Sequence, residues 1–154
     1  MKTLIVYATK NGGTAEIARQ IGDKLEGATL HNLKDEAPNP ADFDAVIIGS
    51  SIYAGKIRKE AAHFIADNLE TLYTKRVGLF ICGLKESQSY WQDNFPPRLL
   101  AHCKSGKFLG CYYDPKKTGF FDRFVVRAVG KIKTNYNGFD AAKAVELVEA
   151  VKNA

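Results

Sequence analysis

Four apolar runs, each of the length of one β-strand, constrain the fold of this chain most strongly. They are TLIVYA at 3–8, AVIIGSS at 45–51, VGLFICG at 77–83 and FLGCYY at 108–113. Runs that are apolar at successive positions are typical of strands covered on both faces, as in a parallel sheet. A weaker run, ATLHNL at 28–33, adds one more strand. We therefore expect five parallel strands.

Helical patterns separate these strands. Ile17, Ile21 and Leu25 recur every four residues, the same spacing is found in 61–69, and 139–152 has the pattern of a closing helix. Strands that alternate with helices of this length indicate an α/β sandwich of three layers, with a parallel sheet between two layers of helices. We expect the strand order 2-1-3-4-5.

The chain reads as a single domain over residues 1–154, because it contains no internal repeat, low-complexity tract or linker. No apolar run approaches the roughly 18 residues of a membrane span, and Met1 leads directly into a strand pattern rather than a signal segment. The three cysteines are odd in number and lack C-x-x-C spacing, which argues against disulfides and a zinc site. We expect a cytoplasmic protein without a metal.

The segment TKNGGT, which follows the first strand, has the chemistry of an anion-binding turn. Thr9, Asn11 and Thr14 offer side-chain donors, and Gly12 and Gly13 let a ligand approach the backbone. The helix that follows directs free N–H groups and the positive end of its dipole at the same place. In a sheet of this order, ligands bind where the strand order reverses, which places this turn in the predicted site. A plain turn with a threonine cap remains the alternative.

Several other ligand classes are excluded by missing motifs. The chain has neither a G-x-x-x-x-G-K-[ST] phosphate loop nor a G-x-G-x-x-G dinucleotide motif. A phosphoacceptor receiver domain needs acidic residues after its first and third strands, where this chain has YATKNG and IGSS. No G-x-S-x-G elbow supports a hydrolase, and no module for nucleic acids accompanies the basic residues. We therefore expect no nucleic-acid partner.

Three loops, TKNGGT, GSSIYAG and CGLKESQSYW, make the sequence resemble the flavodoxin family along almost the whole chain. The resemblance implies a flavodoxin-like fold and FMN as the cofactor. By position, the phosphate would contact Thr9, Lys10, Asn11, Gly12, Gly13 and Thr14. The isoalloxazine ring would contact Ser50, Ser51, Ile52, Tyr53 and Ala54 on one side, and Cys82, Gly83, Leu84 and Lys85 at its edge. Lys10 and Lys85 would favour the anionic, fully reduced flavin.

The positive charge is concentrated in residues 114–134, which we interpret as a basic helical insertion after the fifth strand. The chain as a whole carries a net charge of +5. The basic residues that form this surface are Lys116, Lys117, Arg123, Arg127 and Lys131. Apolar residues, Phe121 and Phe124 among them, mark another helix face. Such a helix could meet an anionic membrane or an acidic redox protein, or it could pack on the sheet edge.

The segments GFFDRFVVRAVGKI and GSSIYAGKIRKE resemble the branch of the family that includes the menaquinone-dependent protoporphyrinogen dehydrogenases. This resemblance implies an FMN oxidoreductase that passes electrons from an organic substrate, such as a porphyrinogen, toward a quinone. It also implies a location at the inner face of the cell membrane. Two alternatives remain open at this point: an FMN electron carrier between proteins, and an interaction module without a cofactor.

Overall fold

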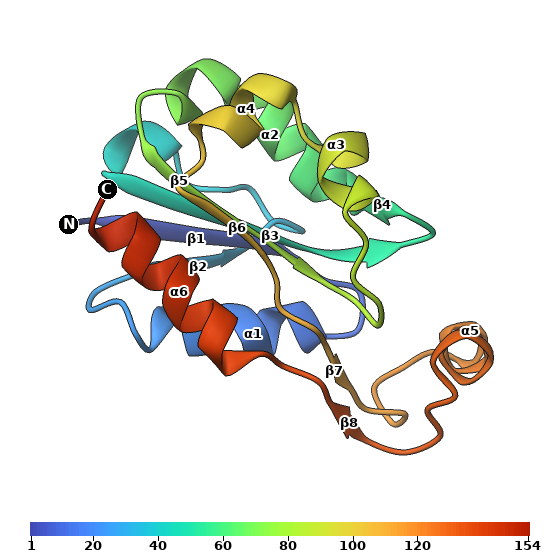
Figure 1. The fold of residues 1–154 in the computed structure, drawn as a ribbon. Helices are drawn as coiled ribbons and strands as arrows, with labels where there is room; N and C mark the ends of the chain where they lie inside the picture. The colour runs from blue at the N-terminus through green and yellow to red at the C-terminus, as the bar shows by residue number, and fades with distance from the viewer.

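The computed structural model describes residues 1–154 and has a central parallel sheet (Figure 1). Its strands run in the order β2-β1-β3-β5-β6, so the predicted order of five parallel strands is confirmed. Their bounds are β1 Thr3–Ala8, β2 Thr29–Asn32, β3 Ala45–Tyr53, β5 Arg76–Cys82 and β6 Ser105–Phe108. A short strand not expected from the sequence, β4 Lys56–Ile57, pairs antiparallel with the end of β3.

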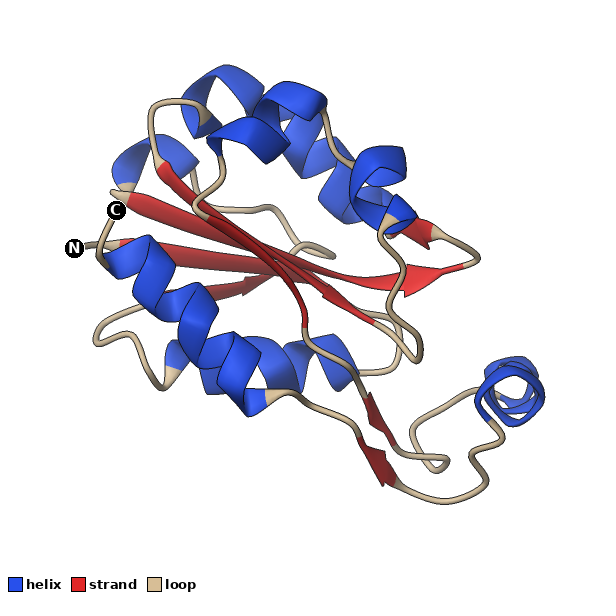
Figure 2. Ribbon diagram, viewed as in Figure 1, coloured by secondary structure: helices blue, strands red, loops and turns tan.

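Helices cover both faces of the sheet (Figure 2). One layer consists of α1 Gly13–Gly22 and α6 Ala141–Lys152. The other contains α2 Lys59–Leu72, α3 Ser89–Asn94 and α4 Pro97–His102, and the short 3-10 helix η1 Pro40–Asp42 lies between β2 and β3 in the chain. The three-layer α/β arrangement expected from the sequence is therefore the one observed.

Two apolar cores, one on each face of the sheet, hold these layers together. Alternate residues of β1 enter different cores: Leu4 and Val6 pack toward the layer of α2, whereas Ile5 packs toward α1 and α6. This division follows from the period of two along a strand, which sends successive side chains to opposite faces. The continuous apolar runs in the sequence are thus explained by burial on both faces.

The strand register brings three loops to one edge of the sheet. Ala8 at the end of β1 pairs with Ser50 of β3, and Ser51 pairs with Cys82 at the end of β5. The carboxyl ends of these three parallel strands therefore lie side by side. The residues that follow them form the predicted site.

The run FLGCYY does not form one continuous strand as predicted. The sheet strand β6 begins earlier and ends at Phe108, and the chain then leaves the sheet at Gly110. Gly110 has a φ of +71°, and a Cβ built there would lie 1.9 Å from the carbonyl oxygen of Gly138. This close crossing of two backbone segments requires glycine and ends the strand.

The residues after Gly110 form a stalk that carries a helix away from the sheet. Two short strands, β7 Tyr112–Tyr113 and β8 Tyr136–Asn137, pair antiparallel, and the helix α5 Phe120–Gly130 lies between them in the chain. Figure 1 shows α5 standing apart from the sheet at the end of this stalk. Within residues 114–134, which we interpret as a helical insertion, the helix is confined to α5, and Lys131 ends it in the left-handed region with a φ of +54°.

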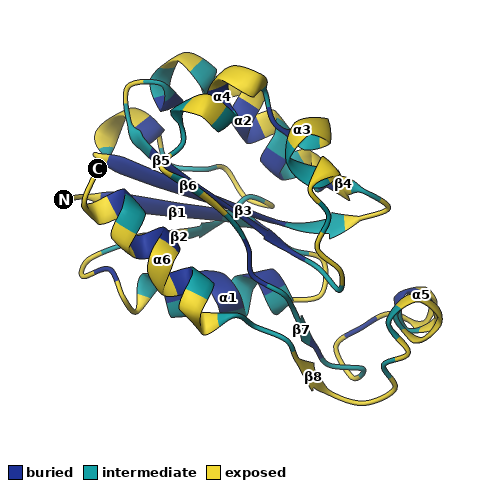
Figure 3. Ribbon diagram, viewed as in Figure 1, coloured by how far each residue is buried: buried dark blue, intermediate teal, exposed yellow.

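The phenylalanine side chains of α5 do not pack on the sheet edge, as one of the alternatives for this helix required. Phe120, Phe121 and Phe124 are 83%, 66% and 65% exposed. Figure 3 shows that α5 is exposed over much of its surface, whereas the sheet strands are buried. Burial of one phenylalanine side chain stabilises a protein by about 1.5–3 kcal/mol. Three exposed phenylalanines on one helix therefore indicate an interaction surface for another molecule or a membrane.

Candidate functional site

A cavity of about 510 Å³ lies at the carboxyl ends of β1, β3 and β5, beneath α5. This volume lies within the usual range for small-molecule sites. Of the predicted cofactor residues, only Gly12 and Ser50 do not line it. A second cavity near Met1, Lys75 and Ala154 lies at the opposite edge, at the amino ends of the strands. Ligands of such sheets bind at the carboxyl ends, so we take the first cavity as the candidate site.

The turn between β1 and α1 has the shape and donors of a phosphate site. Gly12 adopts a φ of +89°, and its backbone N–H donates to Thr9 Oγ1 at 3.0 Å. Thr14, in the first turn of α1, is 2% exposed, and its hydroxyl has no hydrogen-bond partner in the protein. A buried hydroxyl without a partner is costly unless a ligand satisfies it. The turn therefore fits the phosphate of FMN.

The second loop presents an aromatic face to the cavity. It turns back through Ala54 and Gly55, with φ values of +48° and +76°, into β4. Tyr53, just before this turn, lines the cavity and is 50% exposed, so part of its ring is accessible to a flavin. Lys10 Nζ lies 5.6 Å from the centroid of this ring.

Ser50, predicted to flank the ring, does not line the cavity and makes hydrogen bonds within the protein. Its side chain is buried, its hydroxyl donates to the carbonyl of Ser51 at 2.9 Å, and it accepts a bond from the backbone N–H of Arg58 at 2.9 Å. These contacts fix the return of the chain from β4 into α2. Arg58 itself lines the cavity, with its Nε buried and unpaired.

The third loop lies directly beside the second. A Cβ built on Gly83 would lie 2.6 Å from Ile52 Cγ2, so a larger residue would separate the two loops. Cys82 is buried, and burial raises the pKa of its thiol, which leaves it protonated and unreactive at neutral pH. Lys85 lines the cavity and has no carboxylate partner, because Glu86 pairs with Lys143 at 3.1 Å.

The helix α5 supplies a wall of the cavity that the sequence analysis did not predict. Asp122, Val125, Val126 and Val129 line the cavity from the inner side of α5. Their spacing of three and four residues places them on one helix face, and this spacing was the signal available in the sequence.

The lone carboxylate of this wall pairs with the phosphate loop. Lys10 Nζ lies 2.8 Å and 2.7 Å from the two oxygens of Asp122, and Asn11 Nδ2 donates to Asp122 Oδ2 at 3.3 Å. The hydrogen bond from Lys10 lowers the pKa of Asp122, although burial acts against this. Asp122 is therefore ionised at neutral pH. Lys10, expected to act as a free positive charge at the ring, is neutralised by this contact.

Tyr113 is a further side chain that the sequence analysis missed. It lies on β7, lines the cavity and is 8% exposed, and its buried hydroxyl has no partner in the protein. Together with Thr14 and with Arg58, whose Nε is also unpaired, it gives the cavity three polar groups that a bound ligand can satisfy. Nothing in the local pattern CYYD distinguishes Tyr113 from Tyr112, so the sequence alone could not identify it.

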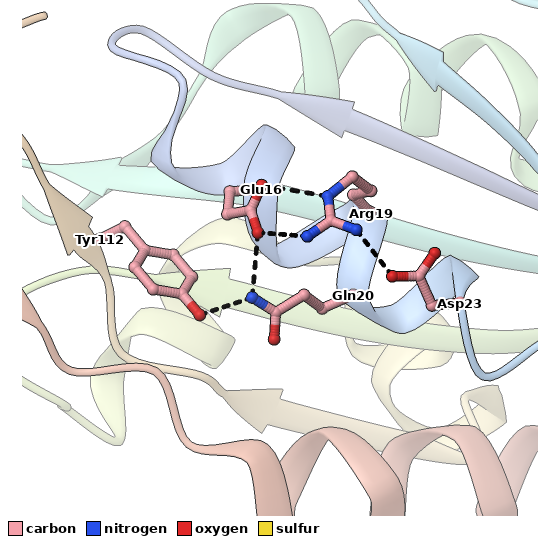
Figure 4. A network of polar contacts seen from close by, with 5 residues as sticks. All are labelled: Glu16, Arg19, Gln20, Asp23 and Tyr112. Carbon is pink, nitrogen blue, oxygen red and sulfur yellow. Dashed lines mark hydrogen bonds and ion pairs between the residues drawn. The ribbon is translucent and has the colours of Figure 1, made fainter.

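A polar network on α1 fixes the root of the stalk (Figure 4). Gln20 Nε2 donates to the hydroxyl of Tyr112 at 2.6 Å and to Glu16 Oε1 at 3.0 Å. Arg19 pairs with Glu16 at 2.7 Å and with Asp23 at 2.8 Å. Hydrogen bonds from Arg19 and Gln20 lower the pKa of Glu16, so this network is charged at neutral pH. It ties β7 to α1 and thereby holds α5 near the cavity.

Comparison with known proteins identifies the family. Residues 4–138 match the flavodoxin domain family. The chain belongs to the flavodoxin family. This family member is also 33% identical over 148 residues to protoporphyrinogen IX dehydrogenase [quinone] of Escherichia coli strain K12. That match covers 86% of this chain and 80% of the relative.

Solved structures agree with this flavodoxin fold. Oxidised flavodoxin 1 from Bacillus cereus superimposes with a TM-score of 0.58 at 12% identity, covering 99% of this chain and 98% of the other. A flavodoxin from the domain Archaea has a TM-score of 0.55 at 16% identity and covers 99% of both chains. A Lactobacillus acidophilus flavoprotein in complex with FMN has a TM-score of 0.52 at 14% identity, covering 71% of this chain and 90% of the other. Membership of the flavodoxin family supports FMN as the cofactor predicted from the sequence.

Proposed function

We propose that this flavodoxin-family protein binds FMN in the cavity and passes electrons from an organic substrate, with a porphyrinogen as the first candidate, to a quinone. The observation that carries this proposal is the wall of Val125, Val126 and Val129, which α5 adds beside the predicted ring site. An apolar wall next to a flavin suits a flat, apolar substrate better than a protein surface. The relative named as a quinone-dependent protoporphyrinogen IX dehydrogenase supports the same substrate class.

The roles of the residues follow from their chemistry. Thr14 and the N–H groups at the start of α1 would hold the phosphate, and Tyr53 would stack on the ring. When bound, FMN supplies a centre that exchanges electrons with organic molecules. Gly83 keeps the second and third loops close enough to contact one ring from two sides. The valines of α5 would exclude water from the substrate side.

The outer side of α5 supports a location of the protein at a membrane surface. It carries the exposed Phe120, Phe121 and Phe124 beside Arg123 and Arg127. Exposed aromatic and basic residues on one helix match the interface of an anionic membrane, where apolar side chains insert and cations meet phosphate groups. None of the helices combines the length and the apolar character that crossing a bilayer requires. We propose that the protein works at the cytoplasmic face of the membrane, with α5 placed at the source of quinone.

An electron carrier between proteins is the second candidate function, and the flavodoxins among the structural relatives favour it. In a carrier, the outer side of α5, with Arg123 and Arg127, would meet an acidic redox protein rather than lipid. The two functions differ in what reduces the bound flavin: an organic substrate for the enzyme, and a flavoprotein reductase for the carrier.

Anaerobic turnover separates these candidates. The FMN-loaded protein is mixed with protoporphyrinogen and menadione, and the appearance of porphyrin is followed by its fluorescence. We expect porphyrin to form many times faster than in a control with free FMN and menadione at the same concentrations. No acceleration, together with rapid reduction of the flavin by a flavodoxin reductase, would assign the protein to the carriers. A protein that takes up no flavin would be an interaction module.

A further inference from the structure

The helix α5 turns a carboxylate inward while it leaves phenylalanines outside. Asp122 is 8% exposed, whereas its neighbours Phe120, Phe121 and Phe124 are more than half exposed. Three valines share this inner face, but the hydrophobic effect gives no reason for a carboxylate to be buried with them while phenylalanines stay outside. A buried charge persists only where it is paired and hydrogen-bonded. The buried position of Asp122 therefore requires a specific partner.

That partner is the phosphate loop. The carboxylate of Asp122 accepts from Lys10 Nζ at 2.8 Å and from Asn11 Nδ2 at 3.3 Å. These are the only side-chain hydrogen bonds between α5 and the rest of the domain. At its other end, α5 passes near the third loop, since a Cβ built on Gly130 would lie 3.3 Å from Leu84 Cδ1. The helix thus crosses the cavity from the first loop to the third, with Asp122 as its polar anchor.

The anchor determines the charge near the ring site. Lys10 Nζ lies 5.6 Å from the centroid of the Tyr53 ring, the surface on which a flavin would stack, and it is held there by Asp122. The side chain of Lys10 is 51% exposed, so its own charge is partly screened by water, whereas that of Asp122 is 11% exposed and less screened. Asp122 thus sets how much positive charge Lys10 presents at this place.

We propose that Asp122 is a positioning residue that holds Lys10 at the flavin site and neutralises its charge, and so limits how strongly the protein favours the fully reduced flavin. The inference rests on the proposed binding of FMN. It concerns the second one-electron step, in which the one-electron-reduced, neutral flavin takes one electron from a reductant and becomes an anion without uptake of a proton. A positive charge near the ring stabilises this anion, and a paired carboxylate cancels that effect.

A double-mutant cycle measures this role. Each FMN-loaded variant is titrated anaerobically with dithionite in the presence of a reference dye, and the potential of the second step is read from the spectra. Asp122→Asn leaves Lys10 unneutralised and should raise the equilibrium constant for this step roughly fivefold, which at 59 mV per tenfold is about 40 mV. Lys10→Met leaves Asp122 unpaired and should lower it by a similar factor. The double variant, which carries neither charge, should return close to the parent value.

A purely structural role of Asp122 would give neither potential shifts of opposite sign in the two single variants nor a return to the parent potential in the double variant. If Asp122 only fastened α5, loss of either partner would open the cavity in the same way, and both single variants would shift the potential in one direction. Shifts of equal sign, or a double variant that differs from the parent as much as a single one, would overturn the inference. Glu149→Gln is the matched control, because Glu149 also pairs with a cation, Lys152, at 3.6 Å, on an exposed part of α6 away from the cavity and the stalk. Its potential should equal that of the parent.

The absorbance spectrum before titration keeps the two proposals apart. A parent protein that shows no bound flavin would overturn the proposed binding of FMN and this inference with it. If the parent binds flavin but its potential is the same in the Asp122 and Lys10 variants, only the role of Asp122 would be overturned.

Discussion

Thr14→Val should lose FMN affinity by about ten- to a hundredfold and yet leave the FMN-free protein at least as stable as the parent. The hydroxyl of Thr14 is buried and has no partner in the protein, so its removal costs the free protein no hydrogen bond. In the complex it would donate to a phosphate, and a hydrogen bond to a charged group contributes about 1.5–3 kcal/mol. The dissociation constant from flavin fluorescence and the free energy of unfolding in urea measure the two effects separately.

Gly12→Val on the same background should weaken FMN further. Gly12 has a φ of +89°, a conformation that a β-branched residue adopts only at a cost of about 1–2 kcal/mol. Because a Cβ at Gly12 would meet no atom within 4 Å, the loop shifts through backbone strain and not through a clash. Thr29→Val on the exposed part of β2 is the matched control and should bind FMN as the parent does. Equal affinity in Thr14→Val and the parent would refute the assignment of the phosphate loop.

Sedimentation with vesicles that contain anionic lipid should be lost in the double variant Arg123→Glu, Arg127→Glu, while FMN remains bound. A basic residue near such a surface contributes about 1 kcal/mol, so removal of two charges alone weakens binding about thirtyfold, and reversal weakens it more. Binding of the parent should also fall as salt rises, because charge interactions are screened.

Two controls identify what binds the vesicles. Lys24→Glu with Lys34→Glu changes the net charge equally at exposed positions outside the insertion and should leave binding nearly unchanged. Phe120→Ser with Phe124→Ser keeps the charge and removes the apolar contact, and should weaken binding even to strongly anionic vesicles. Equal sedimentation of the parent with neutral and anionic vesicles, or with neither, would contradict a lipid-docking role for α5.

The layers of this fold could be predicted from the sequence because they depend on local patterns. Ile5 and Val6 are buried on opposite faces of β1, and the run TLIVYA already required this. The three loops at the carboxyl ends followed from the strand order alone. The break after Phe108 could not be predicted, because the φ of Gly110 is set by Gly138, which is far away in the sequence. Local secondary-structure propensities contain no information about the crossing of two segments that lie far apart in the sequence.

The inner side of α5 is a second feature, this one in the site, that local sequence patterns could not predict. Asp122 belongs to the cavity through Lys10 and Asn11, more than a hundred residues away, and the sequence shows only an isolated acid among basic residues. A charge count therefore predicted a free Lys10, and the structure shows a paired one. Lys85 keeps the predicted free charge, because it has no carboxylate partner and its neighbour Glu86 is used by Lys143. Pairings of charges across a fold have no local signature.

The central claim, an FMN enzyme that delivers electrons to a quinone, is tested most directly by a single turnover. The FMN-loaded protein is reduced with one equivalent of dithionite under anaerobic conditions and mixed with menadione in a stopped-flow instrument, while flavin absorbance is recorded. The account predicts reoxidation that saturates with quinone concentration, as expected if the quinone binds beside the valine wall of α5, and slower reoxidation when Val125 and Val129 are replaced by aspartate. Reoxidation that rises linearly without saturation and does not respond to these replacements would contradict the account.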